Sequence, residues 1–118
     1  MKKVYINDIE FFLPKERENN KKFFNKNKNL FDKIGILNRR IVKKNTSSND
    51  LAVLSARKIL KKTNKKKIDF LIYCTQTGEF NIPTNACILH NSLGLKKNSG
   101  AYDINLGCSA YPYLLSLA

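Results

Sequence analysis

The chain has 118 residues, 42% of them hydrophobic and 26% charged, a composition typical of a soluble globular domain and not of a disordered segment. At this length it forms at most one domain. The formal net charge is +13, but the lysines are mixed with asparagines and form no basic motif with interleaved aromatic residues. This pattern favours a solvated face over a specific nucleic-acid site, and a basic rim would also steer an acidic partner.

Cysteine usage and the N-terminus bear on the compartment. Cys74, Cys87 and Cys108 form no C-x-x-C pair and have no metal-ligand spacing, so no zinc site is expected. An odd number of cysteines without a secretion signal fits a reducing compartment. Asp8 and Glu10 interrupt any apolar signal region, and no segment is long and apolar enough to span a membrane. We therefore expect a cytoplasmic protein.

The N-terminal part of the chain predicts little regular structure. Residues 4–9 alternate as a strand does, and Leu13-Pro14 ends this segment. Residues 17–32 are rich in asparagine and lysine and predict a loose helix or a mobile loop. Residues 35–42 predict a short extended piece with Arg39 and Arg40. Adjacent arginines of this kind could hold a phosphate, but they more often face solvent on alternate sides of a strand.

The remaining residues alternate helices with strands. Residues 49–62 predict the clearest helix, because several N-cap residues precede an apolar run and lysines lie at its end. Residues 69–75 are a continuous apolar run, typical of a strand covered on both faces. The later elements are a helix from Thr84 or Asn85 that Gly94 closes, a strand over residues 101–106 and a helix over residues 109–118. This order predicts an α/β fold with a parallel sheet, whose ligands bind beyond the carboxyl ends of the strands.

Cys108 is the candidate catalytic residue, because it lies between the last predicted strand and the last predicted helix. Gly107 precedes it, and Pro112 is compatible with the helix because it falls in the first turn. A thiol at a helix N-terminus faces unpaired N–H groups and the positive end of the macrodipole, which stabilise the thiolate. The alternative is a small buried hydrophobe, since free cysteine is among the most buried residue types. Position alone leaves both interpretations open.

The other candidate nucleophiles and bases have weaker support. Cys74 and Cys87 are expected to be buried and unreactive, because one lies in an apolar strand and the other on the apolar side of a helix. His90 is the only histidine, and a Cys–His pair is a common route to an activated thiol. Nothing in the spacing brings its ring within hydrogen-bond reach of Cys108, so we expect no direct role there.

Several segments together resemble the 3-oxoacyl-(acyl carrier protein) synthase III family, condensing enzymes with a thiolase-like fold. The strongest match is residues 103–111, in which Cys108 stands at the place of the acyl-accepting cysteine. Weaker matches keep the family's order: the strand that ends at Leu13-Pro14, the block from Gly35-Ile36 to Arg39, residues 69–75, and Pro83 to Gly94. The resemblance covers nearly the whole chain.

The resemblance implies that residues 1–118 are the N-terminal, first half of a thiolase-like α/β fold, with a parallel-rich sheet and covering helices, truncated after the nucleophile helix. It implies an acyltransferase of fatty-acid or related acyl-chain biosynthesis, in which Cys108 takes an acyl group that then condenses with malonyl-(acyl carrier protein). The Cys108 backbone N–H would be one oxyanion donor. The family's histidine and asparagine come from its second half, and His90 does not match that histidine.

The resemblance also implies partners. They are an acyl-coenzyme A or acyl carrier protein thioester as substrate, an acidic acyl carrier protein and, at full length, a second copy in a homodimer; no bound cofactor or metal is implied. Coenzyme A-using members clamp the adenine with an aromatic residue and an arginine. The corresponding residues 29–33 have Lys33 in the arginine's place, and the chain has no tryptophan, which leaves room for an acyl carrier protein as donor.

Two further expectations come from the departures and the charge. Ala110 stands where most relatives have a glycine, which would narrow the helix packing or the acyl pocket. The alternative function is a catalytically incomplete fragment that binds a carrier protein or a partner chain. Specific nucleic-acid binding ranks last.

Overall fold

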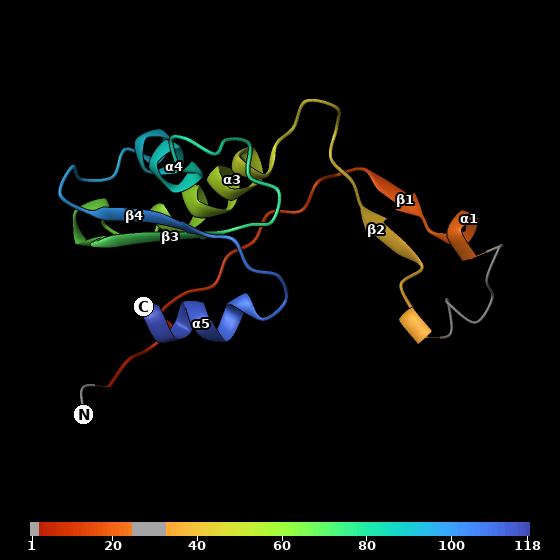
Figure 1. The fold of residues 1–118 in the computed structure, drawn as a ribbon, viewed down its shortest axis with the longest axis horizontal. Helices are drawn as coiled ribbons and strands as arrows, with labels where there is room; N and C mark the ends of the chain where they lie inside the picture. The colour runs from red at the N-terminus through yellow and green to blue at the C-terminus, as the bar shows by residue number, and fades with distance from the viewer. Residues whose placement is uncertain (1–2, 25–32) are drawn as a thin grey trace. The chain divides into compact units, whose positions relative to one another are not determined.

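The computed structural model describes residues 3–24 and 33–118 of the chain (Figure 1). The chain divides into two compact units. Unit 1 comprises Met1–Phe12 and Ser47–Ala118, and unit 2 comprises Leu13–Thr46. The stretch expected to bear on coenzyme A, residues 29–33, falls outside the described residues except for Lys33, as does the part of the predicted 17–32 segment that follows residue 24.

Unit 1 contains a two-stranded parallel sheet. Strand β3 (Phe70–Cys74) pairs with β4 (Gly100–Ile104), and Cys74 lies opposite Ile104. A Cβ at Gly100 would lie 2.3 Å from the Phe70 ring, so a side chain at the start of β4 would displace this exposed ring. The predicted strands over residues 69–75 and 101–106 and their parallel arrangement are confirmed. Among the described residues β3 is half-buried, so it is less buried than its continuous apolar run predicted.

Three helices cover this sheet. In Figure 1, α3 (Ser48–Leu60) and α4 (Asn85–Leu93) lie on one face and α5 (Ala110–Leu117) lies on the other. These helices confirm the three predicted from the sequence, including the position of Pro112 in the first turn of α5. A capping box begins α3, where Ser47 Oγ accepts from Asp50 N at 3.0 Å and the Asp50 carboxylate accepts from Ser47 N at 3.0 Å.

The core of unit 1 lies mainly under α4. Its buried apolar residues are Ala86, Leu89, Leu93, Leu95 and Ala110. Three of these lie on one face of α4, and Gly94, with φ +62°, ends the helix in the left-handed conformation that was predicted for it. A short 3₁₀ helix, η1 (Lys65–Lys67), leads into β3, and Lys65 Nζ donates to the carbonyl oxygen of Leu93 at 2.7 Å.

The prediction of a strand over residues 4–9 is wrong, because these residues pair with no other strand among the described residues. A segment of alternating apolar and polar residues forms a strand only where a second strand lies beside it and exchanges backbone hydrogen bonds with it. Here the segment is held through its side chains and one carbonyl. Lys62 pairs with Asp8 and Glu10, and Lys58 Nζ donates to the carbonyl oxygen of Phe11 at 2.7 Å.

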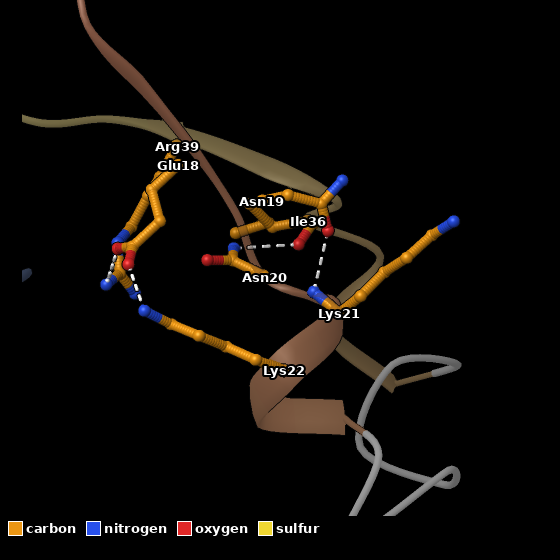
Figure 2. A network of polar contacts seen from close by, with 7 residues as sticks. All are labelled: Glu18, Asn19, Asn20, Lys21, Lys22, Ile36 and Arg39. Carbon is orange, nitrogen blue, oxygen red and sulfur yellow. Dashed lines mark hydrogen bonds and ion pairs between the residues drawn. The ribbon is translucent and has the colours of Figure 1, made fainter.

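The described part of unit 2 contains a short antiparallel pair of strands, with a helical turn directly after the first strand. Strand β1 (Arg17–Asn19) pairs with β2 (Asn38–Arg40), and α1 (Lys21–Phe24) follows β1. Figure 2 shows the Glu18 carboxylate between Lys22 and Arg39. The extended piece predicted over residues 35–42 is confirmed by β2. The prediction of a loose helix or loop from residue 17 is wrong for β1, because a three-residue strand is too short to show periodicity.

The two arginines of β2 bond within unit 2. Arg39 pairs with Glu18, and Arg40 Nη1 donates to the carbonyl oxygens of Pro14 at 3.1 Å and Lys15 at 3.0 Å. The Lys22 ammonium that donates to Glu18, together with the nearby Arg39, holds the pKa of the Glu18 carboxyl below its ordinary value, while burial acts in the opposite direction.

Candidate active site

Cys108 lies in the turn between β4 and α5, at the carboxyl edge of the sheet, and its side chain is exposed. The amide N of Ala110 donates to the carbonyl oxygen of Gly107 at 2.9 Å and closes this turn. Ser109 is the N-cap of α5, has helical dihedrals and makes no side-chain capping bond. The thiol therefore lies where the sequence predicted it, and it is not the buried hydrophobe of the alternative interpretation.

The turn that carries Cys108 lies against the end of β3 and the segment after it. A Cβ at Gly107 would lie 3.2 Å from Gln76 Nε2, so the Gln76 carboxamide packs against the residue just before the cysteine. Cys74 Sγ lies 3.6 Å from the carbonyl oxygen of Leu106. Backbone and side chains from the carboxyl ends of both strands thus meet at the nucleophile turn, as expected for a parallel sheet.

Asp103, on β4, anchors the N-terminus of α4. One carboxylate oxygen accepts from Asn85 N at 2.7 Å and Asn85 Nδ2 at 3.0 Å, and the other accepts from Ala86 N at 2.5 Å. A carboxylate at this end of a helix satisfies unpaired N–H groups and complements the macrodipole. Thr84 occupies the predicted N-cap position without a side-chain capping bond, so Asp103 performs the capping.

Asn85 extends these contacts to the loop after β3. Its Oδ1 accepts from Asn49 Nδ2 at 3.0 Å, from Glu79 N at 3.0 Å and from Phe80 N at 3.4 Å. Its Nδ2 donates to the carbonyl oxygen of Phe80 at 3.0 Å as well as to Asp103. Both amide side chains, of Asn49 and Asn85, belong to buried residues.

Sequence reasoning missed this Asp103–Asn85–Asn49 network. The signal that could have found it is the aspartate inside the apolar strand 101–106, because a charged residue there requires polar partners. The sequence pattern indicates Asn85 only as a possible N-cap.

The remaining candidates lie away from Cys108 or differ from expectation. His90 Nε2 lies 2.7 Å from Ser99 Oγ and 3.1 Å from the carbonyl oxygen of Lys96, in the turn that leads into the opposite, amino end of β4. The expectation that His90 does not serve Cys108 agrees with this placement. The prediction that Cys87 is buried is wrong. Its thiol is exposed, because the buried face of α4 consists of Asn85, Ala86, Leu89 and Leu93.

Within residues 3–24 and 33–118, no group of three or more histidine, cysteine or acidic side chains is arranged to hold a metal ion. In the same described part of the chain, no helix has both the length and the apolar character that crossing a bilayer requires.

Comparison with known proteins identifies the fold. No family model matches this chain. The structure aligns with a crystal structure of 3-oxoacyl-(acyl-carrier-protein) synthase III at a TM-score of 0.83 and 37% identity, covering 95% of this chain and 35% of that one. It also aligns with 3-oxoacyl-(acyl-carrier-protein) synthase from Burkholderia xenovorans LB400 at a TM-score of 0.80 and 32% identity, covering 89% of this chain and 32% of that one. The fold is that of part of a thiolase-like protein.

The sequence narrows this class. The chain is 34% identical over 91 residues to the β-ketoacyl-[acyl-carrier-protein] synthase III of Syntrophomonas wolfei subsp. wolfei. This alignment covers 75% of the chain and 27% of that protein. The resemblance stated from the sequence is confirmed, and the chain is a relative of 3-oxoacyl-(acyl-carrier-protein) synthase III. It spans about a third or less of the length of these relatives.

Proposed function

We propose that this chain carries the acyl-accepting part of a condensing acyltransferase of fatty-acid or related acyl-chain biosynthesis, with Cys108 as the nucleophile. The observation that supports the proposal most directly is the exposed thiol in the turn between β4 and the N-terminus of α5. Nucleophilic cysteines characteristically lie exposed beside the N-terminus of a helix, where backbone N–H groups lack intrahelical partners. The relatives of this chain are 3-oxoacyl or β-ketoacyl synthases, which agrees with this chemistry.

In the first step, Cys108 Sγ attacks the carbonyl carbon of an acyl thioester. The acyl group forms a new thioester with Sγ, and the carrier's thiolate leaves and takes up a proton. The Cys108 backbone N–H is one donor to the oxyanion of the tetrahedral intermediate. In the second step, malonyl-(acyl carrier protein) loses carbon dioxide, its carbanion attacks the acyl carbon, and Sγ leaves as thiolate. No bound cofactor takes part in either step.

The donor of the acyl group is coenzyme A or an acyl carrier protein. The net charge of +13 supports an acidic acyl carrier protein as partner, because opposite charge speeds encounter. The complete protein acts as a homodimer in the cytoplasm. A binding module without turnover is the second candidate, and the same charge favours it; acylation of Cys108 separates the two, because a binding module needs no nucleophile.

The test is acyl transfer to the thiol, followed by intact mass. Incubation with an acyl thioester should add one acyl mass, and Cys108→Ala should abolish the addition. Cys87→Ala is the matched control, because Cys87 is also exposed and also lies near a helix N-terminus; it should keep the adduct. Cys108 should also react with iodoacetamide faster than Cys87 near pH 7. Acylation that survives Cys108→Ala would show that the nucleophile is misassigned.

A further inference from the structure

We propose that Asn85 and Asp103 are positioning residues for the reaction at Cys108. They fix the loop of residues 76–80 against the nucleophile turn, residues 106–109, so that the Gln76 carboxamide forms a wall beside the thiol. The inference rests on the proposed function, since it concerns how substrate is held at that nucleophile.

The first step of the argument is that Asp103 ties the nucleophile strand to α4. Asp103 lies five residues before Cys108 on the strand that leads into the turn. Its two carboxylate oxygens accept from Asn85 N, Asn85 Nδ2 and Ala86 N at 2.5 to 3.0 Å. The strand and the helix therefore cannot shift against each other without breaking three charge-assisted hydrogen bonds.

The second step is that the side chain of Asn85 fixes the backbone of the loop of residues 76–80. Its amide bonds the backbone at Glu79 N and at both polar groups of Phe80, at 3.0 to 3.4 Å. A Cβ at Gly78 would lie 2.6 Å from Asn85 Nδ2, so the loop backbone passes directly over the amide and only glycine fits. Ser48 Oγ adds a bond to the carbonyl oxygen of Thr77 at 2.8 Å.

The third step is that the held loop contacts the nucleophile turn. Gln76 precedes the residues that Asn85 and Ser48 bind, and its carboxamide packs on Gly107, adjacent to Cys108. Buried polar networks of this kind tend to fix one geometry, because a displaced member leaves buried groups unpaired. A loop fixed in this way can hold an acyl thioester in a reactive orientation.

The experiment compares Asn85→Ala with Asn91→Ala, an exposed asparagine on the same helix. Asn85→Ala should speed hydrogen–deuterium exchange at the amides of Glu79 and Phe80. It should also lower the rate of Cys108 acylation at saturating acyl thioester by roughly 10- to 100-fold, the scale expected for misplaced reactants. The rate of Cys108 alkylation by iodoacetamide should change by less than about threefold, because so small a reagent does not depend on the Gln76 carboxamide for its orientation. Asn91→Ala should change none of the three.

A charge-swap series keeps the test valid if Asn85→Ala does not fold. Asn85→Asp places two carboxylates at the 3.0 Å contact with Asp103 and should slow acylation, and Asp103→Asn in that background should restore part of the rate. A merely structural role would lower the melting temperature and alter alkylation along with acylation. If wild-type protein is acylated and Asn85→Ala is acylated at the same rate, or if the swap restores nothing, the inference is wrong while the proposed function stands. If wild-type Cys108 takes no acyl group, both fail.

Discussion

Leu89 in unit 1 and Asn20 in unit 2 are both buried, with 2% and 7% of their surfaces exposed, but their surroundings differ. Leu89 lies in an apolar core with other residues of α4, whereas Asn20 is a buried polar residue of a unit whose described apolar side chains include the half-exposed Ile34 and Ile36. Asn20 Nδ2 donates to the carbonyl oxygen of Ile36 at 2.9 Å (Figure 2).

The difference shows what each unit depends on. Apolar burial stabilises unit 1, and it is the unit that carries the Cys108 turn. The described residues of unit 2 are joined by hydrogen bonds and by the ion pairs of Glu18 with Lys22 and Arg39, and exposed ion pairs are each worth little. Truncating a described apolar residue should therefore have a large effect in the core of unit 1 and a small one in unit 2.

The largest expected effect is that of Leu89→Ala. Removing a buried leucine side chain from a packed core should lower the free energy of unfolding by about 2 to 5 kcal/mol. Urea unfolding followed by circular dichroism measures the change. The matched control is Leu13→Ala in unit 2, where the side chain is half-exposed; it should cost less than about 1 kcal/mol. Equal costs at the two positions would show that the units do not differ as described.

The same contrast explains which parts of the fold could be predicted. The three helices and two strands of unit 1 follow from caps and apolar runs, for example the glycine that ends α4. The strand predicted over residues 4–9 fails because alternation does not identify a partner strand. In unit 2, β1 has no apolar pattern, and Glu18 opposite Arg39 is visible only once the strands pair.

The candidate site shows the same contrast between features that local sequence patterns predict and features that they do not. Cys108 could be placed from the sequence, because a local pattern of strand, glycine, cysteine and helix determines its surroundings. The Asn85–Asp103 contacts join residues 18 positions apart, and the contact of Gln76 with Gly107 joins residues that are still farther apart in the sequence. Contacts of this kind depend on how α4 packs on the sheet, which no local pattern encodes.

An effect of intermediate size on stability is expected at two glycines with positive φ, one in each unit. Gly94 has φ +62° and ends α4 in unit 1, and Gly35 has φ +66° in unit 2. Alanine in this conformation is strained by roughly 1 to 2 kcal/mol, and the nearest atom to a new Cβ at Gly94, Lys65 Nζ, is at an ordinary 3.6 Å. Gly94→Ala should lower the urea midpoint of unit 1, because α4 carries its core. Gly35→Ala should leave that midpoint unchanged and speed amide exchange only in β1 and β2. A drop in the unit 1 midpoint on Gly35→Ala would mean that the two units unfold together.

The smallest expected effect concerns Glu18, whose pKa the Lys22 and Arg39 cations lower in the folded protein. A carboxyl with a lowered folded pKa stabilises unit 2 at pH values above its unfolded pKa of about 4.3, and that stabilisation is lost as the pH falls through the folded pKa. Amide chemical shifts of Asn38 and Arg40 in β2, followed by NMR from pH 7 downward, should therefore move in this acidic range. Glu18→Gln removes the charge, so it should flatten this response and leave the urea midpoint of unit 1 unchanged. Glu16→Gln, which alters an exposed glutamate just before β1, should leave the titration intact. If the shifts of β2 titrate alike in both variants, the ion pairs of Glu18 contribute nothing to unit 2, and its remaining hydrogen bonds hold the strands together.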